Sequence, residues 1–210
     1  MNKHKHATIA GLAAVLSLAA AAQANATAVV IDAKNNSLFG DTGVFTGINL
    51  IAGEGLKVHV DAADIWSAGG TPLWSNANGL TANLYATGSD ESGYAAGILI
   101  GQPLGAGAML FDGYAATVGS LVGKIGGTYK QLGTDFDGIA WGTGELRLYF
   151  WDNPSSTYDN KDHVTAEITH GFPQIDTPPT GAVPEPGTWA LMIMGFGGVG
   201  AMLRRRAVCA

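Results

Sequence analysis

Residues 146–151 read Leu-Arg-Leu-Tyr-Phe-Trp. Side chains of a β-strand point alternately to its two faces, so this order predicts a strand with two different faces. The buried face is predicted to consist of Leu146, Leu148 and Phe150. The exposed face is predicted to consist of Arg147, Tyr149 and Trp151.

The same alternation recurs on both sides of this segment. Residues 56–61 and 164–169 each alternate apolar side chains with polar or charged ones. Further strand candidates, bounded by Gly, Asp or Asn, are 28–33, 45–51, 97–101, 118–125 and 136–141. No window predicts a soluble helix or a repeat. Short strands at this spacing are typical of an all-β sandwich or jelly roll, which we place at residues 27–175.

Two stretches of this region lack a clear strand pattern. The segment from Ser67 to Gly107 is rich in Gly, Ala, Ser and Asn, so long loops are predicted there. Pro- and Thr-rich sequence begins near residue 171, and we place a linker at 176–183.

Charge limits the molecules that the domain is expected to bind, and cysteine content limits the disulfides and metal sites that it can form. Residues 27–183 hold 16 acidic and six basic side chains, a balance of −10. This acidity disfavours nucleic acid and anionic lipid and is compatible with cations, although it also serves solubility. The single cysteine, Cys209, excludes an internal disulfide, and no Cys/His zinc spacing occurs.

The N-terminus has the three parts of a secretory signal peptide, predicted at residues 1–26. Basic residues at 3–6 precede an apolar run at 7–22, and Ala24-Asn25-Ala26 supplies the small-x-small pattern that signal peptidase recognises. We predict cleavage after Ala26, with Ala24 as the nearby alternative. An uncleaved membrane anchor is the competing interpretation, which the weakly hydrophobic Ala-rich run disfavours.

The C-terminus carries a second apolar segment with ordered flanks. It begins Pro184-Glu185-Pro186, continues through Trp189-Ala190, and ends in Arg204, Arg205 and Arg206. The prolines favour an extended approach, and the apolar stretch is short for a span of about 20 residues. Because basic residues stay cytoplasmic, the preceding domain is predicted to lie outside.

These ordered elements resemble the PEP-CTERM sorting signal, in its PEPxxWA form, over residues 184–206. The resemblance implies recognition by an exosortase, an integral-membrane cysteine protease of Gram-negative bacteria. The chain would be held transiently in the inner membrane by the C-terminal helix and then released or re-anchored at the envelope or outer surface. A plain C-terminal anchor is the alternative.

A polar turn between the last two predicted strands is the richest local chemistry. Residues 151–162 contain three carboxylates, two amides and three Ser or Thr hydroxyls. Ca²⁺ takes six to eight oxygen ligands, so such a turn is suited to it, although the spacing is not that of an EF-hand. From composition alone, an ordinary polar hairpin loop is the favoured interpretation.

An ordered set of segments resembles PA-I (LecA) type galactophilic lectins. The set comprises 119–127, 144–150, the polar turn and 164–168, preceded by 58–70, and it spans about 110 residues. The resemblance implies a small β-sandwich with Ca²⁺ bridging protein to sugar hydroxyls. It implies side-chain ligands Asp152, Asp159 and Asn160, a backbone oxygen of Ser156, and a carbonyl near Gly69.

The chain also departs from this lectin pattern. Ser155 stands in place of a glycine, and Lys161-Asp162 replace Ser-Gly. No histidine occurs between His59 and His163, whereas the lectin sugar loop provides His and Gln contacts. The corresponding region, roughly 75–118, is an Ala/Gly-rich insertion.

Three functions compete at this point. The first is a Ca²⁺-dependent carbohydrate-binding or adhesion module acting on exopolysaccharide or biofilm matrix. The second is a non-catalytic structural component of the envelope or matrix. The third, a glycosidase, needs two carboxylates about 5–10 Å apart, and Asp135 and Asp137 share one strand face. No Ser/His/Asp order or HExxH motif occurs, so we expect no enzymatic activity.

Overall fold

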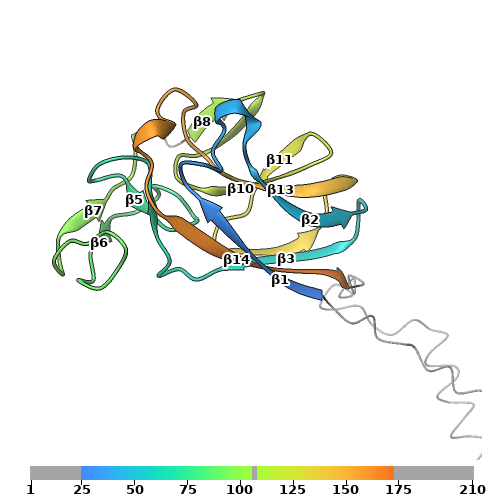
Figure 1. Cartoon of the computed structure of the whole chain (residues 1–210), viewed down its shortest axis with the longest axis horizontal. Helices are drawn as coiled ribbons and strands as arrows, with labels where there is room; N and C mark the ends of the chain where they lie inside the picture. The colour runs from blue at the N-terminus through green and yellow to red at the C-terminus, as the bar shows by residue number, and fades with distance from the viewer. Residues whose placement is uncertain (1–24, 106–107, 173–210) are drawn as a thin grey trace, which may run out of the picture. The chain divides into compact units, whose positions relative to one another are not determined.

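The strands assemble into two antiparallel sheets packed face to face. The computed structural model describes residues 25–105 and 108–172 (Figure 1). Sheet A has four strands, in the order β1 (Asn25–Asp32), β14 (His163–Phe172), β3 (Gly55–Val60) and β12 (Asp135–Ile139). Sheet B has four, in the order β11 (Thr128–Gln131), β10 (Leu121–Ile125), β13 (Gly144–Phe150) and β2 (Val44–Leu50). The predicted all-β sandwich is confirmed.

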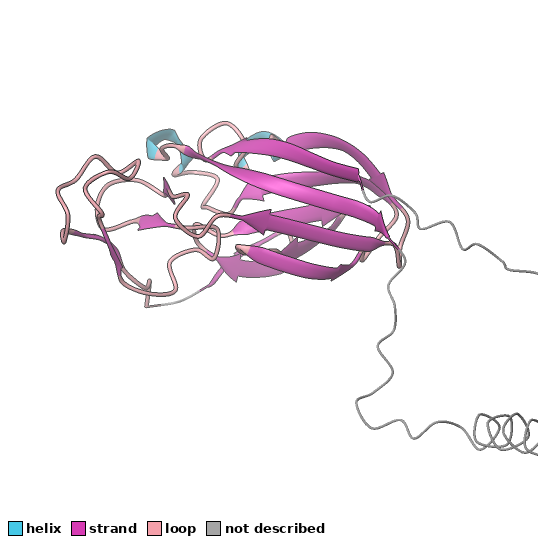
Figure 2. Cartoon of the chain, turned by 90° about the horizontal axis from the view of Figure 1, so that it is seen from below, coloured by secondary structure: helices cyan, strands magenta, loops and turns pink. Residues whose placement is uncertain are grey.

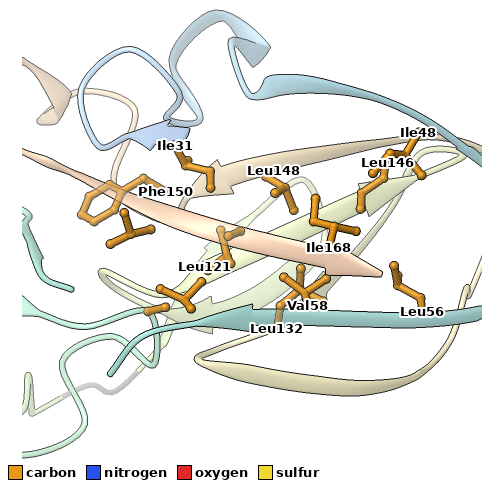
Figure 3. Close-up of a cluster of buried hydrophobic side chains, with 14 of the residues drawn as sticks. Ile31, Ile48, Leu56, Val58, Leu121, Leu132, Leu146, Leu148, Phe150 and Ile168 are labelled. Atoms are coloured by element: carbon orange, nitrogen blue, oxygen red, sulfur yellow. The ribbon is translucent and has the colours of Figure 1, made fainter. Parts of the chain in front are cut away.

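The core lies between the two sheets (Figure 3). Sheet A contributes Leu56, Val58 and Val60 from β3, and sheet B contributes Leu146, Leu148 and Phe150 from β13, all at most 1% exposed. Trp66 packs edge-on against the Phe150 ring, with a centroid distance of 4.6 Å. The buried faces predicted from alternation are therefore confirmed, because these apolar side chains leave water together.

Part of the outer face of sheet B is also buried, which corrects the prediction for Tyr149 and Trp151. Tyr149 and Trp151 are fully buried instead of exposed. The hairpin of β8 (Ala108–Phe111) and β9 (Tyr114–Thr117) packs over them, and the Trp151 indole N–H donates to the Met109 carbonyl at 3.0 Å. The prediction was wrong because an element some 40 residues away in sequence covers this face.

The segment predicted to form long loops contains four short strands. β4 (Trp66–Ser67) pairs with β5 (Trp74–Ser75), and β6 (Leu84–Tyr85) pairs with β7 (Leu99–Gly101). They lie with their connecting loops at one end of the sandwich (Figure 2). A separate apolar cluster supports them, formed by Ile65, Trp74, Ala86 and Ile100. β7 falls inside the strand candidate predicted at 97–101, whereas β4, β5 and β6 have two residues each, too few for an alternation to reveal.

Strand bounds differ from the predicted ones at two instructive places. Residues 118–120 precede β10 as a turn, in which the Ser120 N–H donates to the Thr117 carbonyl. β1 begins at Asn25, inside the predicted signal peptide, and Ala26 pairs with Thr169. Cleavage after Ala26 would therefore remove the first two residues of this strand, whereas cleavage after Ala24 would retain them.

Several predictions lie outside the described residues. They are the remainder of the signal peptide with Ala24, the linker at 176–183, and the sorting signal with its helix at 184–206. Within the part of the chain that is described, no helix combines the length and apolar character needed to cross a membrane.

Candidate functional site

The polar turn connects β13 to β14 and is held at both ends. It contains one 3-10 turn, η2 (Thr157–Asp159). Before it, the Trp151 N–H donates to the Ser120 carbonyl at 3.0 Å. After it, Lys161 and Ser67 exchange two backbone hydrogen bonds of 2.9 and 3.0 Å. The turn is thus tied to β4, far away in sequence.

Three predicted ligands point unpaired oxygens into the protein. Asp152 and Asn160 are only 5% and 4% exposed, and the Asn160 amide donates to the Ala33 carbonyl at 3.1 Å. Asp152 Oδ2, Asp159 Oδ1 and Asn160 Oδ1 are buried without a hydrogen-bond partner. Each unsatisfied buried acceptor costs about 1–3 kcal/mol. A cation would satisfy all three, since each is a free oxygen acceptor.

The electrostatics of Asp152 reflect the same crowding of oxygens. Burial raises the pKa of Asp152 to about 6, and the Asp159 charge pushes it in the same direction. The Asn153 backbone N–H and the Asn160 side chain oppose this rise in pKa by hydrogen bonding. Asp152 and Asp159 therefore lie near enough to repel when both are ionised, and a bound cation would relieve that repulsion.

Gly69 lies directly against this cluster. An added Cβ at Gly69 would sit 2.8 Å from Asp159 Oδ2, and the residue has φ of 137°. Its carbonyl accepts a hydrogen bond from the Ser67 hydroxyl at 2.5 Å, which orients the loop. The fold thus brings Gly69 to Asp159, although about 90 residues separate them in the chain.

Ser156 stands apart from the other predicted ligands. It is half-buried, and its backbone N–H donates to the Asn153 carbonyl at 2.8 Å. No hydrogen bond among the described residues joins it to Asp152, Asp159 or Asn160.

The two neighbouring glycines at 69 and 70 allow a matched test of this packing. Gly69→Ala is expected to destabilise the protein by about 1–3 kcal/mol, because the alanine meets both an unfavourable φ and the Asp159 carboxylate. Gly70→Ala is expected to cost less than about 1 kcal/mol, since its added Cβ meets no atom within 4 Å. Urea unfolding of both variants measures the difference. Equal losses would contradict the contact between Gly69 and Asp159.

The donor set fits Ca²⁺ better than a transition metal. It offers two carboxylates and one amide oxygen, which are hard oxygen ligands. Residues 25–105 and 108–172 contain no group of three or more His, Cys, Asp or Glu side chains able to hold a metal ion. A cation here would therefore depend on amide and backbone oxygens, as Ca²⁺ sites commonly do.

One departure from the lectin pattern has a structural consequence. Asp162, where the resembled family has glycine, adopts a positive φ of 66°. Its carboxylate accepts a hydrogen bond from the His163 N–H at 2.9 Å, which offsets part of the strain. Lys161 is exposed, so its replacement of serine leaves the turn's interior unchanged.

The carboxylate pair considered for glycoside hydrolysis is engaged with basic neighbours. On the exposed face of sheet A, Asp135 contacts His59 at 2.6 Å and Asp137 contacts Lys57 at 2.8 Å. Both carboxylates are largely solvent-exposed, at 73% and 63%. Neither carboxylate lies in the buried apolar environment that a general acid needs, so the geometry lends no support to a glycosidase.

The His59–Asp135 contact predicts that the stability of the folded protein depends on pH. Hydrogen bonding to Asp135 raises the pKa of His59, so the pair's stabilisation is present below about pH 6.5 and is lost as pH rises through the raised value. Asp135→Asn is expected to lower the His59 pKa in an NMR titration. Asp137→Asn, whose partner is Lys57, is the control and should leave it unchanged. An unaltered His59 titration in Asp135→Asn would refute the pairing.

Sequence reasoning missed the groups that position the turn. The Ala33 carbonyl and the Ser67 hydroxyl hold Asn160 and Gly69 respectively. A backbone carbonyl leaves no trace in the residue pattern, and Ser67 is one serine among many in a Gly/Ser-rich stretch. Only the folded chain identifies them.

Comparison with known proteins addresses the C-terminal segment first. Residues 182–206 match the PEP-CTERM protein-sorting motif. The match agrees with the sorting signal predicted at 184–206 and marks the chain as an exported, exosortase-processed protein. No curated protein matches the sequence.

Among solved structures, the sandwich is similar to one described as EclA N-terminal domain; PllA-like lectin. The sequence identity is 18%, the TM-score is 0.44, and the alignment covers 68% of this chain and 94% of the other. At this identity and TM-score, we draw no conclusion about ligands from the similarity.

Proposed function

We propose that this exported, exosortase-processed protein is a Ca²⁺-dependent carbohydrate-binding module. The observation that carries the proposal is the convergence of Asp152, Asp159 and Asn160, each with an unpaired buried oxygen, beside Gly69. An ordinary hairpin loop would turn such groups toward water, because leaving them unpaired is costly. The sequence resemblance to PA-I type lectins supports the same assignment.

The chain's residues would hold the ion and leave part of its coordination sphere open. When bound, Ca²⁺ accepts neutral oxygen ligands, including hydroxyls of a sugar. The protein offers three side-chain oxygens, fewer than the six to eight that Ca²⁺ takes. The remaining positions suit water or a vicinal pair of sugar hydroxyls, so recognition needs no deep pocket.

The register of sheet A places the candidate site at one end of β14. β1 pairs with β14 from Asp32↔His163, beside the polar turn, to Asn25↔His170 at the other end. Eight residues of strand span about 24 Å. The candidate site and the residue at which the described chain ends, Phe172, therefore lie at opposite ends of the strand. We propose exopolysaccharide or matrix glycan as the ligand class.

Calcium titration followed by glycan binding tests the proposal. Protein lacking only its signal peptide is expected to bind Ca²⁺ in calorimetry, and to bind immobilised neutral glycans in Ca²⁺ more strongly than in EGTA. Absence of Ca²⁺ binding at millimolar concentration would refute the metal site. Calcium binding without any glycan binding would favour a structural role in the envelope or matrix.

A further inference from the structure

A groove around Leu84 lies outside the polar turn. It consists of two adjoining depressions, both lined by Leu84, with volumes of about 400 and 250 Å³. The Asn76 amide of the smaller depression donates to the Ala62 carbonyl of the larger at 3.3 Å, joining their walls. We call the two together the Leu84 groove. The larger depression alone is in the range of small-molecule sites, about 300–1,000 Å³.

The lining chemistry differs between the two halves. The larger half presents the Tyr85 side chain, 54% exposed, beside the apolar Ile65 and the carboxylates of Asp90 and Glu91. The smaller half is lined by amides and hydroxyls, those of Ser75, Asn76, Asn78, Thr81 and Asn83. An aromatic ring suits the apolar face of a sugar, while amides, hydroxyls and carboxylates exchange hydrogen bonds with its hydroxyl groups.

Tyr85 is held in place by structure on each side. It belongs to β6, which pairs with β7, and the following Ala86 N–H donates to the Ile98 carbonyl at 2.8 Å. Ala86 and Ile65 belong to the buried apolar cluster beneath it. A backbone held in place before binding loses little conformational entropy when a ligand arrives.

Asp90 holds the loop that follows Tyr85 in place by side-chain hydrogen bonds. Its carboxylate accepts hydrogen bonds from Ser92 and from Thr87, the Thr87 hydroxyl lying at 2.9 Å. These hydrogen bonds, that of the Ser92 hydroxyl first, lower the pKa of Asp90 and keep it ionised. The larger half therefore carries a fixed negative charge.

Charge decides which glycan the groove accepts. Among the described residues that line its two halves, none is Lys or Arg, whereas Asp90 and Glu91 are acidic. Polyanionic polysaccharides would be repelled. We propose that the Leu84 groove binds a neutral, hydroxyl-rich oligosaccharide, independently of calcium and of the 152–160 turn, with which it shares no residue.

Neutral tetrasaccharides of glucose, galactose or mannose are suitable probes, tested by calorimetry and saturation-transfer NMR. The protein lacking only its signal peptide is used in EGTA, so that any calcium-dependent site is silent. At least one probe is expected to bind, and Tyr85→Ala is expected to weaken its binding about tenfold. Tyr85→Phe, which keeps the ring, should bind within about twofold of the parent.

Tyr94→Ala is the matched control. Tyr94 is 42% exposed in the same loop region but does not line the groove, so its loss should leave affinity unchanged. Absence of binding by every neutral probe in EGTA, or equal affinity of Tyr85→Ala and the parent, would overturn the proposal. The proposal would also be overturned if an oligouronate bound and no neutral probe did. Failure of Ca²⁺ binding at Asp152 would leave it standing.

Discussion

Replacing Asp152 with asparagine is expected to stabilise the calcium-free protein and to remove its response to calcium. Burial raises the pKa of Asp152 to about 6, above the ordinary value of 3.8. The folded state therefore holds this proton more tightly than the unfolded state does. The free energy of unfolding accordingly falls as pH rises from about 4 to about 6, and the penalty is fully present at pH 7.5.

Asparagine has the same shape without the charge, so Asp152→Asn should gain roughly 1–3 kcal/mol in EGTA at pH 7.5. In excess calcium the parent becomes the more stable of the two proteins, because a ligand at about 1,000 times its Kd stabilises the parent alone by about 4.1 kcal/mol. Urea unfolding at pH 7.5, in EGTA and in excess calcium, measures both effects.

Asp162→Asn is the control for this calcium-dependent change in which protein is more stable. Asp162 lies in the same turn, and asparagine can still accept the hydrogen bond from the His163 N–H and adopt the positive φ. It should retain the calcium response of the parent. A calcium response that persists in Asp152→Asn, or a loss of stability in EGTA, would contradict the role assigned to Asp152.

Phe150→Ala is expected to cost about 3–5 kcal/mol, a large part of the stability of a domain of this size. The Phe150 ring is fully buried between the sheets and lies edge-on to Trp66, so its removal leaves a cavity that a two-sheet core cannot readily close. Urea unfolding in EGTA gives the change in free energy without a contribution from calcium.

Phe39→Ala removes the same ring from the surface and serves as the comparison. Phe39 is 63% exposed, so its replacement should change stability by less than about 1 kcal/mol. Comparable losses in Phe39→Ala and Phe150→Ala would show that the core is not where the alternation of residues 146–151 places it.

The sheets were predictable where one face of a strand meets the core and the other meets water. Leu56, Val58 and Val60 obey that rule on β3, with exposed Lys57 and His59 between them. The rule failed at Tyr149 and Trp151, because Tyr129 of β11 and the β8–β9 hairpin cover this part of the outer face of sheet B. Alternation records a strand's own periodicity and carries no information about a remote element that covers it.

The candidate site was predictable in its local part only. Asp152, Asp159 and Asn160 stand within nine residues, so their oxygens could be grouped from the sequence. Gly69 entered through a family resemblance, and its contact with Asp159 depends on the backbone pairing of Ser67 with Lys161. The Leu84 groove had no precursor in the sequence, since the segment that forms it was expected to be loop.

The sequence by itself determined the sorting motif and the strand periodicity. Processing enzymes read a short linear motif, and alternation is a property of neighbouring residues, so neither requires distant contacts. Tertiary structure alone decided which oxygens of the polar turn are buried and unpaired, and where Tyr85 stands. Burial is a collective property of segments far apart in the chain: Asn160 meets Ala33, and Asp159 meets Gly69, only once the segments around β1, β4 and β14 have packed.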